Sequence, residues 1–119
     1  MHGVPADLDL HRFHGATLTQ VVISEFQVQF VFISPQLIIG VEGAWEIRSV
    51  DGDIVDHSLP NDQRDSFKVH RLLARTIAAS VVNTPQSFTI TFDNGWSLSV
   101  FDSSREYESF SINPGDIYV

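Results

Sequence analysis

The stretch Ser87–Val100 constrains the fold of this chain more than any other part of the sequence. Apolar residues alternate with threonines as far as Phe92, and from Trp96 onward apolar residues alternate with serines. This period predicts the two strands of a β-hairpin that buries one face and leaves the other in water. An Asn94-Gly95 turn would place Phe92 opposite a serine. We therefore predict a three-residue turn, Asp93-Asn94-Gly95, with Gly95 in the left-handed conformation.

The pairing within this hairpin follows from the turn. The predicted apolar pairs are Phe92 with Trp96, Ile90 with Leu98 and Phe88 with Val100, and the polar pairs are Thr91 with Ser97 and Thr89 with Ser99. Each pair brings like side chains onto one face, as cross-strand packing requires.

The remaining sequence predicts an α+β domain that is mostly antiparallel β-sheet. We expect one domain over residues 1–119, because a chain of 119 residues can bury its own core. The expected parts are an irregular segment over 1–13, a first β-meander over 14–58, a helix over 62–74 and a second β-meander over 76–119. Leu8, Leu10 and Phe13 are expected to pack against the body of the domain, and Asp51-Gly52 to turn a hairpin.

The helix prediction rests on the apolar residues Phe67, Val69, Leu72 and Leu73, which would share one side of a helix. Asp62 or Asp65 would cap its N-terminus, and Arg71 and Arg75 suit its C-terminal end.

The first hairpin turns at Ile33-Ser34-Pro35-Gln36, and its predicted pairs are Phe32 with Leu37, Phe30 with Ile39 and Val28 with Val41. Its other face is apolar near the turn and polar farther away. The sequence therefore offers Val31, Ile33, Ile38 and Glu42 as candidate partner contacts. Cover by the helix or by the N-terminal segment is the alternative for the apolar residues.

The two halves of the chain carry similar apolar patterns. Thr17-Leu18 matches Thr76-Ile77; Val28, Phe30 and Phe32 match Phe88, Ile90 and Phe92; Leu37, Ile39 and Val41 match Trp96, Leu98 and Val100; and Trp45-Glu46-Ile47 matches Phe110-Ser111-Ile112. One meander cannot bury its own apolar face, whereas two meanders and a helix can enclose a core. Duplication and chance likeness of two meanders are both open at this point.

Charge and composition narrow the function classes. The net charge of −8 disfavours nucleic-acid binding and favours a basic partner, although it also serves solubility. The chain lacks cysteine, a long apolar run and a recognisable leader, so we expect a cytoplasmic protein without a membrane span.

Catalytic and metal-binding motifs are weak. Asp7, Asp9, His11 and His14 lack the spacing of a known metal site, and Asp56-His57 with Ser66 lacks a nucleophile elbow. Glu106 and Glu108 beside Tyr107 are better explained as charges that protect an edge strand than as acid–base pairs. We expect no catalytic residue, cofactor or metal.

Aromatic residues offer an alternative site. Trp45, Trp96 and Tyr107 could wall a small-ligand or enzymatic pocket, although such residues, like Phe110, more often fill a β-core.

Several motifs in order resemble a bacterial family of small proteins known only as a domain of unknown function. They are Gly15-Ala16-Thr17-Leu18-Thr19, Asp51-Gly52, Leu72-Leu73-Ala74-Arg75-Thr76-Ile77, Phe92-Asp93-Asn94-Gly95, Tyr107-Glu108-Ser109-Phe110 and Asn113-Pro114-Gly115. The chain departs from the family at Ile33-Ser34-Pro35-Gln36, where the family has Asp-Asp-Gly, and at Ala74, where glycine is frequent. The resemblance implies no known reaction.

The sequence thus favours a non-enzymatic protein-binding module, with an immunity-type inhibitor of a basic toxin as the leading interpretation. A homodimer formed through the first hairpin is the second interpretation, and a ligand-binding or enzymatic domain with the aromatic pocket is the third.

Overall fold

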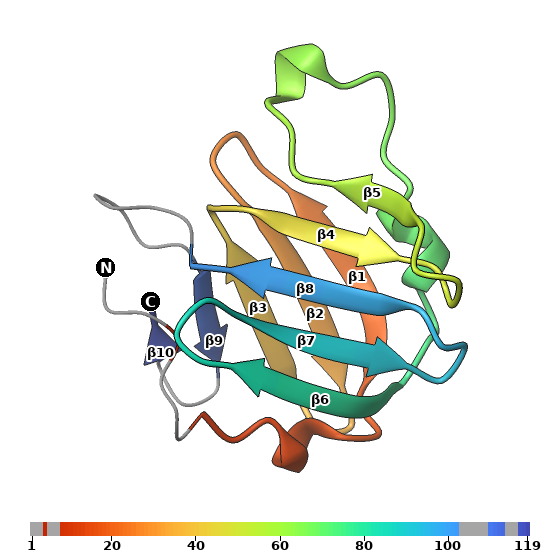
Figure 1. Cartoon of the computed structure of the whole chain (residues 1–119), viewed down its shortest axis with the longest axis vertical. Coiled ribbons are helices and arrows are strands. Elements are labelled where there is room, and N and C mark those ends of the chain that lie inside the picture. Colours follow the sequence, from red (N-terminus) through yellow and green to blue (C-terminus); the bar gives the residue numbers. More distant parts are fainter. Residues whose placement is uncertain (1–3, 5–7, 103–109, 114–116) are drawn as a thin grey trace.

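The computed structural model describes residues 4, 8–102, 110–113 and 117–119, which form two antiparallel β-sheets packed face to face (Figure 1). One sheet has the strand order β1-β2-β3-β9-β10 and the other has the order β5-β4-β8-β7-β6. The strands of the first sheet are β1 (Thr17–Ile23), β2 (Val28–Ile33), β3 (Leu37–Val41), β9 (Phe110–Asn113) and β10 (Ile117–Tyr118). Those of the second are β4 (Trp45–Arg48), β5 (Ile54–His57), β6 (Ile77–Asn83), β7 (Ser87–Phe92) and β8 (Ser97–Phe101).

The two sheets share one topology and exchange strands. Each begins with three consecutive strands, β1-β2-β3 or β6-β7-β8, and continues with two strands from the other half of the chain. Strand β4 leaves the first meander to pair with β8, and β9 leaves the second meander to pair with β3. This exchange was not part of the sequence prediction, which kept each meander in its own half.

Both long hairpins have the predicted register. Phe88 pairs with Val100 and Ile90 with Leu98, while Phe92 donates its backbone N–H to the Trp96 carbonyl. Gly95 has φ +85°, the left-handed conformation that the turn needs. On the polar face, the Thr89 and Ser99 hydroxyls are 2.7 Å apart. The predicted pairs of the first hairpin, Phe32 with Leu37, Phe30 with Ile39 and Val28 with Val41, are also confirmed.

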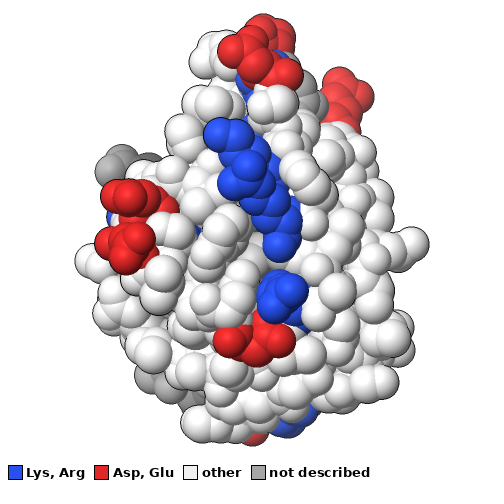
Figure 2. Space-filling model, turned by 90° about the vertical axis from the view of Figure 1, so that its right-hand side faces the viewer, with Lys and Arg blue, Asp and Glu red and all other residues white. Residues whose placement is uncertain are grey.

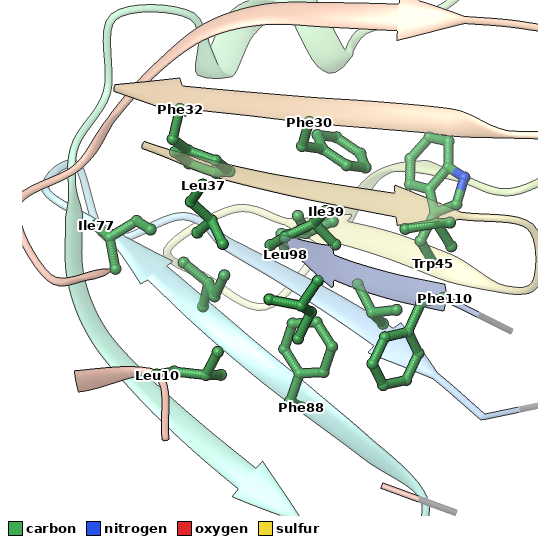
Figure 3. Packing of buried hydrophobic residues seen from close by; sticks show 14 of the residues in the cluster. Leu10, Phe30, Phe32, Leu37, Ile39, Trp45, Ile77, Phe88, Leu98 and Phe110 are labelled. Carbon is green, nitrogen blue, oxygen red and sulfur yellow. The ribbon is translucent and has the colours of Figure 1, made fainter. Parts of the chain in front are cut away.

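The core lies between the sheets and is lined by the inward residues of both (Figure 3). Phe30 meets Trp45 edge to face at a centroid distance of 5.9 Å, and Phe88 meets Phe110 in the same way at 5.0 Å. Both contacts join strands of opposite sheets. Aromatic pairs of this geometry add stability beyond the area they bury.

The predicted helix over 62–74 is wrong. The described residues contain no α-helix, and this segment holds only the 3-10 turns η2 (Asn61–Gln63) and η3 (Val69–Leu72). Val69 and Leu72 are buried, but Leu73 is 39% exposed, so the apolar residues do not share one helical face. The Lys68 backbone N–H bonds the Asp56 carboxylate at 2.7 Å, and Ala74 has φ +72°, which no α-helix accommodates.

The N-terminal segment packs as predicted where it is described. Leu8, Leu10 and Phe13 are buried, and His11–Phe13 forms the 3-10 turn η1. The edge strand predicted around Glu106, Tyr107 and Glu108 lies outside the described part of the chain, which resumes at Phe110. Within the described ranges, no helix combines the length and hydrophobicity needed to cross a bilayer.

Candidate functional site

An open cleft lies at one end of the sandwich, between the β1–β2 turn, the β3–β4 connection and the segment after β5. Its volume is about 400 Å³. The lining residues are Ser24, Glu25, Phe26, Gln27, Val28, Val41, Glu42, Gly43, Trp45, Ser58, Leu59 and Pro60. Each sheet contributes to the cleft, because Val28 and Val41 belong to the first sheet and Trp45 belongs to the second.

The cleft has a mixed lining of apolar, polar and acidic residues. Trp45 and Val41 are buried, whereas Phe26 is 77% exposed at the tip of its turn. Glu25 and Glu42 are both exposed, and none of the described lining residues is basic. A cleft lined partly by apolar residues and partly by two carboxylates can contact a hydrophobic group and attract an adjacent positive charge. This arrangement suits binding and contains no nucleophile–base pair.

The candidate contact residues from the sequence fall in two places. Val31 and Ile38 are opposite each other in the β2–β3 pairing, and Ile33, which is 50% exposed, lies beside them at the β1 edge of the hairpin end. Glu42 follows Val41 at the other end of β3, roughly 13 Å along the strand from Ile38. Only Glu42 therefore lines the cleft.

The aromatic pocket considered as an alternative is not formed by the two tryptophans. Trp45 pairs with Val100 near the end of β8, whereas Trp96 precedes the first residue of that strand. The two side chains therefore lie near opposite ends of β8, and Trp96 does not line the cleft. Tyr107 lies outside the described residues.

A buried ion pair holds the segment beside the cleft. Arg64 Nη1 lies 2.7 Å from Asp56 Oδ1, and the two side chains are only 4% and 7% exposed. Arg64 also donates to the His57 and Ser66 carbonyls, and its guanidinium stacks 3.9 Å from the centroid of the Phe67 ring. Asp56 faces inward because β5 pairs it with the buried Ile47. These contacts fix the path of the chain after Leu59 and Pro60, which line the cleft.

Asp56 pairs with Arg64 and does not form the catalytic arrangement with His57 and Ser66 that the sequence suggested as an alternative. Asp56 accepts hydrogen bonds from Arg64 and from the backbone N–H groups of His57 and Lys68, and the His57 side chain is exposed. The sequence pattern missed the pair because Asp56 occupies an inward strand position, where an apolar residue is the usual expectation.

The histidines considered as metal ligands have other neighbours. His14 Nε2 lies 2.9 Å from the Ser80 hydroxyl, and Asp9 accepts the backbone N–H of His11. Asp7 lies outside the described residues. Among the residues with described positions, no group of three His, Asp or Glu side chains is arranged to hold a metal ion.

Several basic residues gather on one face of the molecule. Figure 2 shows a face on which Lys and Arg side chains form a stripe, with Asp and Glu side chains around it. Lys68, Arg71 and Arg75 are exposed within one short segment around η3. Since none of them lines the cleft, the acidic rim of the cleft is not neutralised by these residues.

Three comparisons bear on the relationship of this chain to known proteins. No protein-family model, curated protein or solved structure matches the chain. The resemblance to a family of unknown function therefore stays a prediction from motifs.

Proposed function

We propose that this protein is a non-enzymatic binding module that captures a basic protein partner through the acid-rimmed cleft. The observation that carries the proposal is that Glu25, Glu42 and the exposed Phe26 line one cleft, together with the apolar residues Val28, Val41 and Leu59. Exposed aromatic residues beside apolar pockets are frequent anchors in protein interfaces. The net charge of −8 speeds capture of a positively charged partner.

Within this class, an immunity-type inhibitor of a basic toxin is the specific function that we propose. Such an inhibitor needs a stable scaffold and a complementary surface, and it needs no catalytic group. The two packed sheets supply the scaffold, and the cleft supplies the surface.

Co-expression with the product of the neighbouring gene, followed by affinity purification, tests this function. We expect a complex with a basic protein that weakens as salt is raised, because exposed charges are screened. Growth rescue of cells that express the partner alone would identify it as a toxin. Recovery of no partner, or of an acidic partner held equally well at high salt, would contradict the proposal.

Self-association is the second candidate, and it is favoured by the exposed Ile33 beside the half-buried Val31 and Ile38. Light scattering at tens of micromolar decides between the two states. A dimer that Ile33→Lys converts to a monomer would support this candidate, whereas a wild-type monomer would remove it.

We also propose that the two halves of the chain are repeats of one unit. The identical strand orders support this interpretation, as do the 3-10 turns η1 and η3, which both begin at or next to a His-Arg pair, His11-Arg12 and His70-Arg71.

A further inference from the structure

The cleft has a counterpart at the equivalent end of the other half. Trp45 pairs with Val100 in one sheet, and Phe110 pairs with Val41 in the other, so the two aromatic residues are equivalent. The backbone hydrogen bonds to these two residues are also equivalent. Ser58 donates its backbone N–H to the Trp45 carbonyl, and Val119 donates its backbone N–H to the Phe110 carbonyl. The cleft residues Val28, Val41 and Trp45 therefore correspond to Phe88, Val100 and Phe110.

The chain itself places a buried aliphatic residue beside this counterpart. Val4, in the N-terminal segment, is 2% exposed and belongs to the hydrophobic core. Its backbone N–H donates to the Pro85 carbonyl at 2.9 Å, in the turn between β6 and β7. The equivalent turn between β1 and β2 carries Glu25 and Phe26 at its tip. The β6–β7 turn thus accepts a hydrogen bond from a buried aliphatic residue of the N-terminal segment, whereas the equivalent β1–β2 turn lines the open cleft.

We infer that the open cleft takes an extended peptide segment of the partner, inserts an aliphatic side chain where Val4 lies in the other half, and holds flanking lysine or arginine residues on Glu25 and Glu42. This inference rests on the proposed function and names the chemistry of the partner. The peptide N–H next to the aliphatic residue would donate to a carbonyl of the Glu25-Phe26 turn, as Val4 does to Pro85.

The charges and the size of the cleft agree with this occupant. The two carboxylates border the hollow and are exposed, so a cationic side chain reaches them without being buried. A hollow of about 400 Å³ is large enough for a valine or leucine side chain together with its backbone. Phe26, which is exposed and lines the cleft, offers an aromatic surface for the apolar part of the segment.

Fluorescence anisotropy with a labelled, capped peptide tests the inference on the full chain. The probe is acetyl-Lys-Lys-Gly-Val-Pro-Lys-Lys-amide, with matched peptides that carry glycine for valine or glutamate for every lysine. We expect the glycine peptide to bind about tenfold more weakly, since burial of one valine contributes enough free energy for that factor. We expect no measurable binding of the glutamate peptide.

Protein variants locate the site. Glu42→Gln and Phe26→Ala should each weaken binding of the valine peptide at least about fivefold, because each removes a contact at the rim. Val28→Phe places in the cleft the residue found at the equivalent position Phe88 and should abolish binding. Asp53→Asn removes an exposed charge from the β4–β5 turn, away from the cleft, and should leave binding unchanged. Circular dichroism establishes that each variant is folded, and Phe26→Ala decides the matter if Val28→Phe does not fold.

Three outcomes overturn the inference, and each is distinct from failure of the proposed function. Equal binding of the valine and glycine peptides would reduce the interaction to charge alone. Binding that Glu42→Gln and Phe26→Ala leave intact would place the site elsewhere. Dimerisation of the wild type that Phe26→Ala reverses would identify a second copy as the occupant. In the first two cases a basic partner recovered by co-expression still supports a binding module. The proposed function itself fails when co-expression recovers no partner, or an acidic partner that is held equally well at high salt.

Discussion

Thr17 and Thr76 pair with each other in an antiparallel bridge that joins the two sheets at one corner of the sandwich. The backbone bonds around this bridge are reciprocal. Gly15 donates to Ile77 at 2.7 Å, Ala74 to Leu18 at 2.8 Å, Leu18 to Arg75 at 2.9 Å and Ile77 to Ala16 at 2.9 Å. Each half of the chain therefore makes the same contacts to the other half, as a pseudo-twofold arrangement requires.

Ala74 is the first test of this reciprocity. It has φ +72° and is equivalent to Gly15, which has φ +91°. We expect Ala74→Gly to raise the free energy of unfolding by about 0.5 to 1 kcal/mol, because relief of the left-handed strain exceeds the added freedom of glycine in the unfolded chain. Urea denaturation measures this change.

Gly15→Ala is the matched control for Ala74→Gly. No other atom lies within 4 Å of a Cβ built at Gly15, so only the backbone conformation is at issue. This variant should lower the free energy of unfolding by about 1 kcal/mol. Changes of the same sign in the two variants would contradict the equivalence of the two positions.

Removal of one member of the buried pair of Asp56 and Arg64 should be strongly destabilising. Asp56→Ala leaves the Arg64 guanidinium buried without its counter-ion, and the expected loss in the free energy of unfolding is about 3 kcal/mol or more. Thermal and urea unfolding measure it. The double variant Asp56→Leu with Arg64→Met should lose much less, because no charge stays buried. Additive losses would show that the two residues act independently.

Phe88 and Phe26 should differ sharply in their effect on stability. Phe88 is fully buried, and Phe88→Ala should lower the free energy of unfolding by about 3 to 5 kcal/mol. Phe26→Ala removes a largely exposed ring and should change it by no more than about 0.5 kcal/mol. The same urea titrations compare them, and a large loss for Phe26→Ala would mean that this ring supports the fold rather than binding.

Cleavage of the chain between the halves should leave them bound to each other. A protease site inserted after Pro60, which is exposed, cuts the connection between β5 and β6. Each sheet takes strands from both fragments, so we expect size-exclusion chromatography and native mass spectrometry to find a stable two-chain complex. Separation of the fragments without denaturant would argue against the exchanged strands.

The sequence predicts the hairpins well because their pairing is local. In Ser87–Val100, alternation and a turn with glycine fix both the buried face and the register, and the structure has the same pairs. Alternation does not state which sheet a strand joins. Trp45 and Phe110 were matched as equivalent residues, but their exchange between the sheets depends on contacts between distant parts of the chain.

The errors have a related cause. Val69 and Leu72 are three residues apart, a spacing that fits a 3-10 turn as well as an α-helix. The Lys68 backbone N–H bonds the Asp56 carboxylate, so it is not available to the hydrogen bonds of the predicted α-helix. In the cleft, Glu42 was among the predicted contacts, whereas Glu25 and Phe26 were missed. Their signal is an aromatic residue at the tip of a tight turn, where glycine or asparagine is usual.

The exchange of β4 and β9 also has a consequence for how the molecule comes apart. Each sheet loses an inner strand as soon as the opposite half begins to open, since β4 lies between β5 and β8, and β9 lies between β3 and β10. Neither half of the chain can therefore unfold while the other half keeps its complete sheet. Amide hydrogen exchange should therefore report a single slow opening shared by Ile47 and Ile112, which lie in different sheets and are far apart in the sequence.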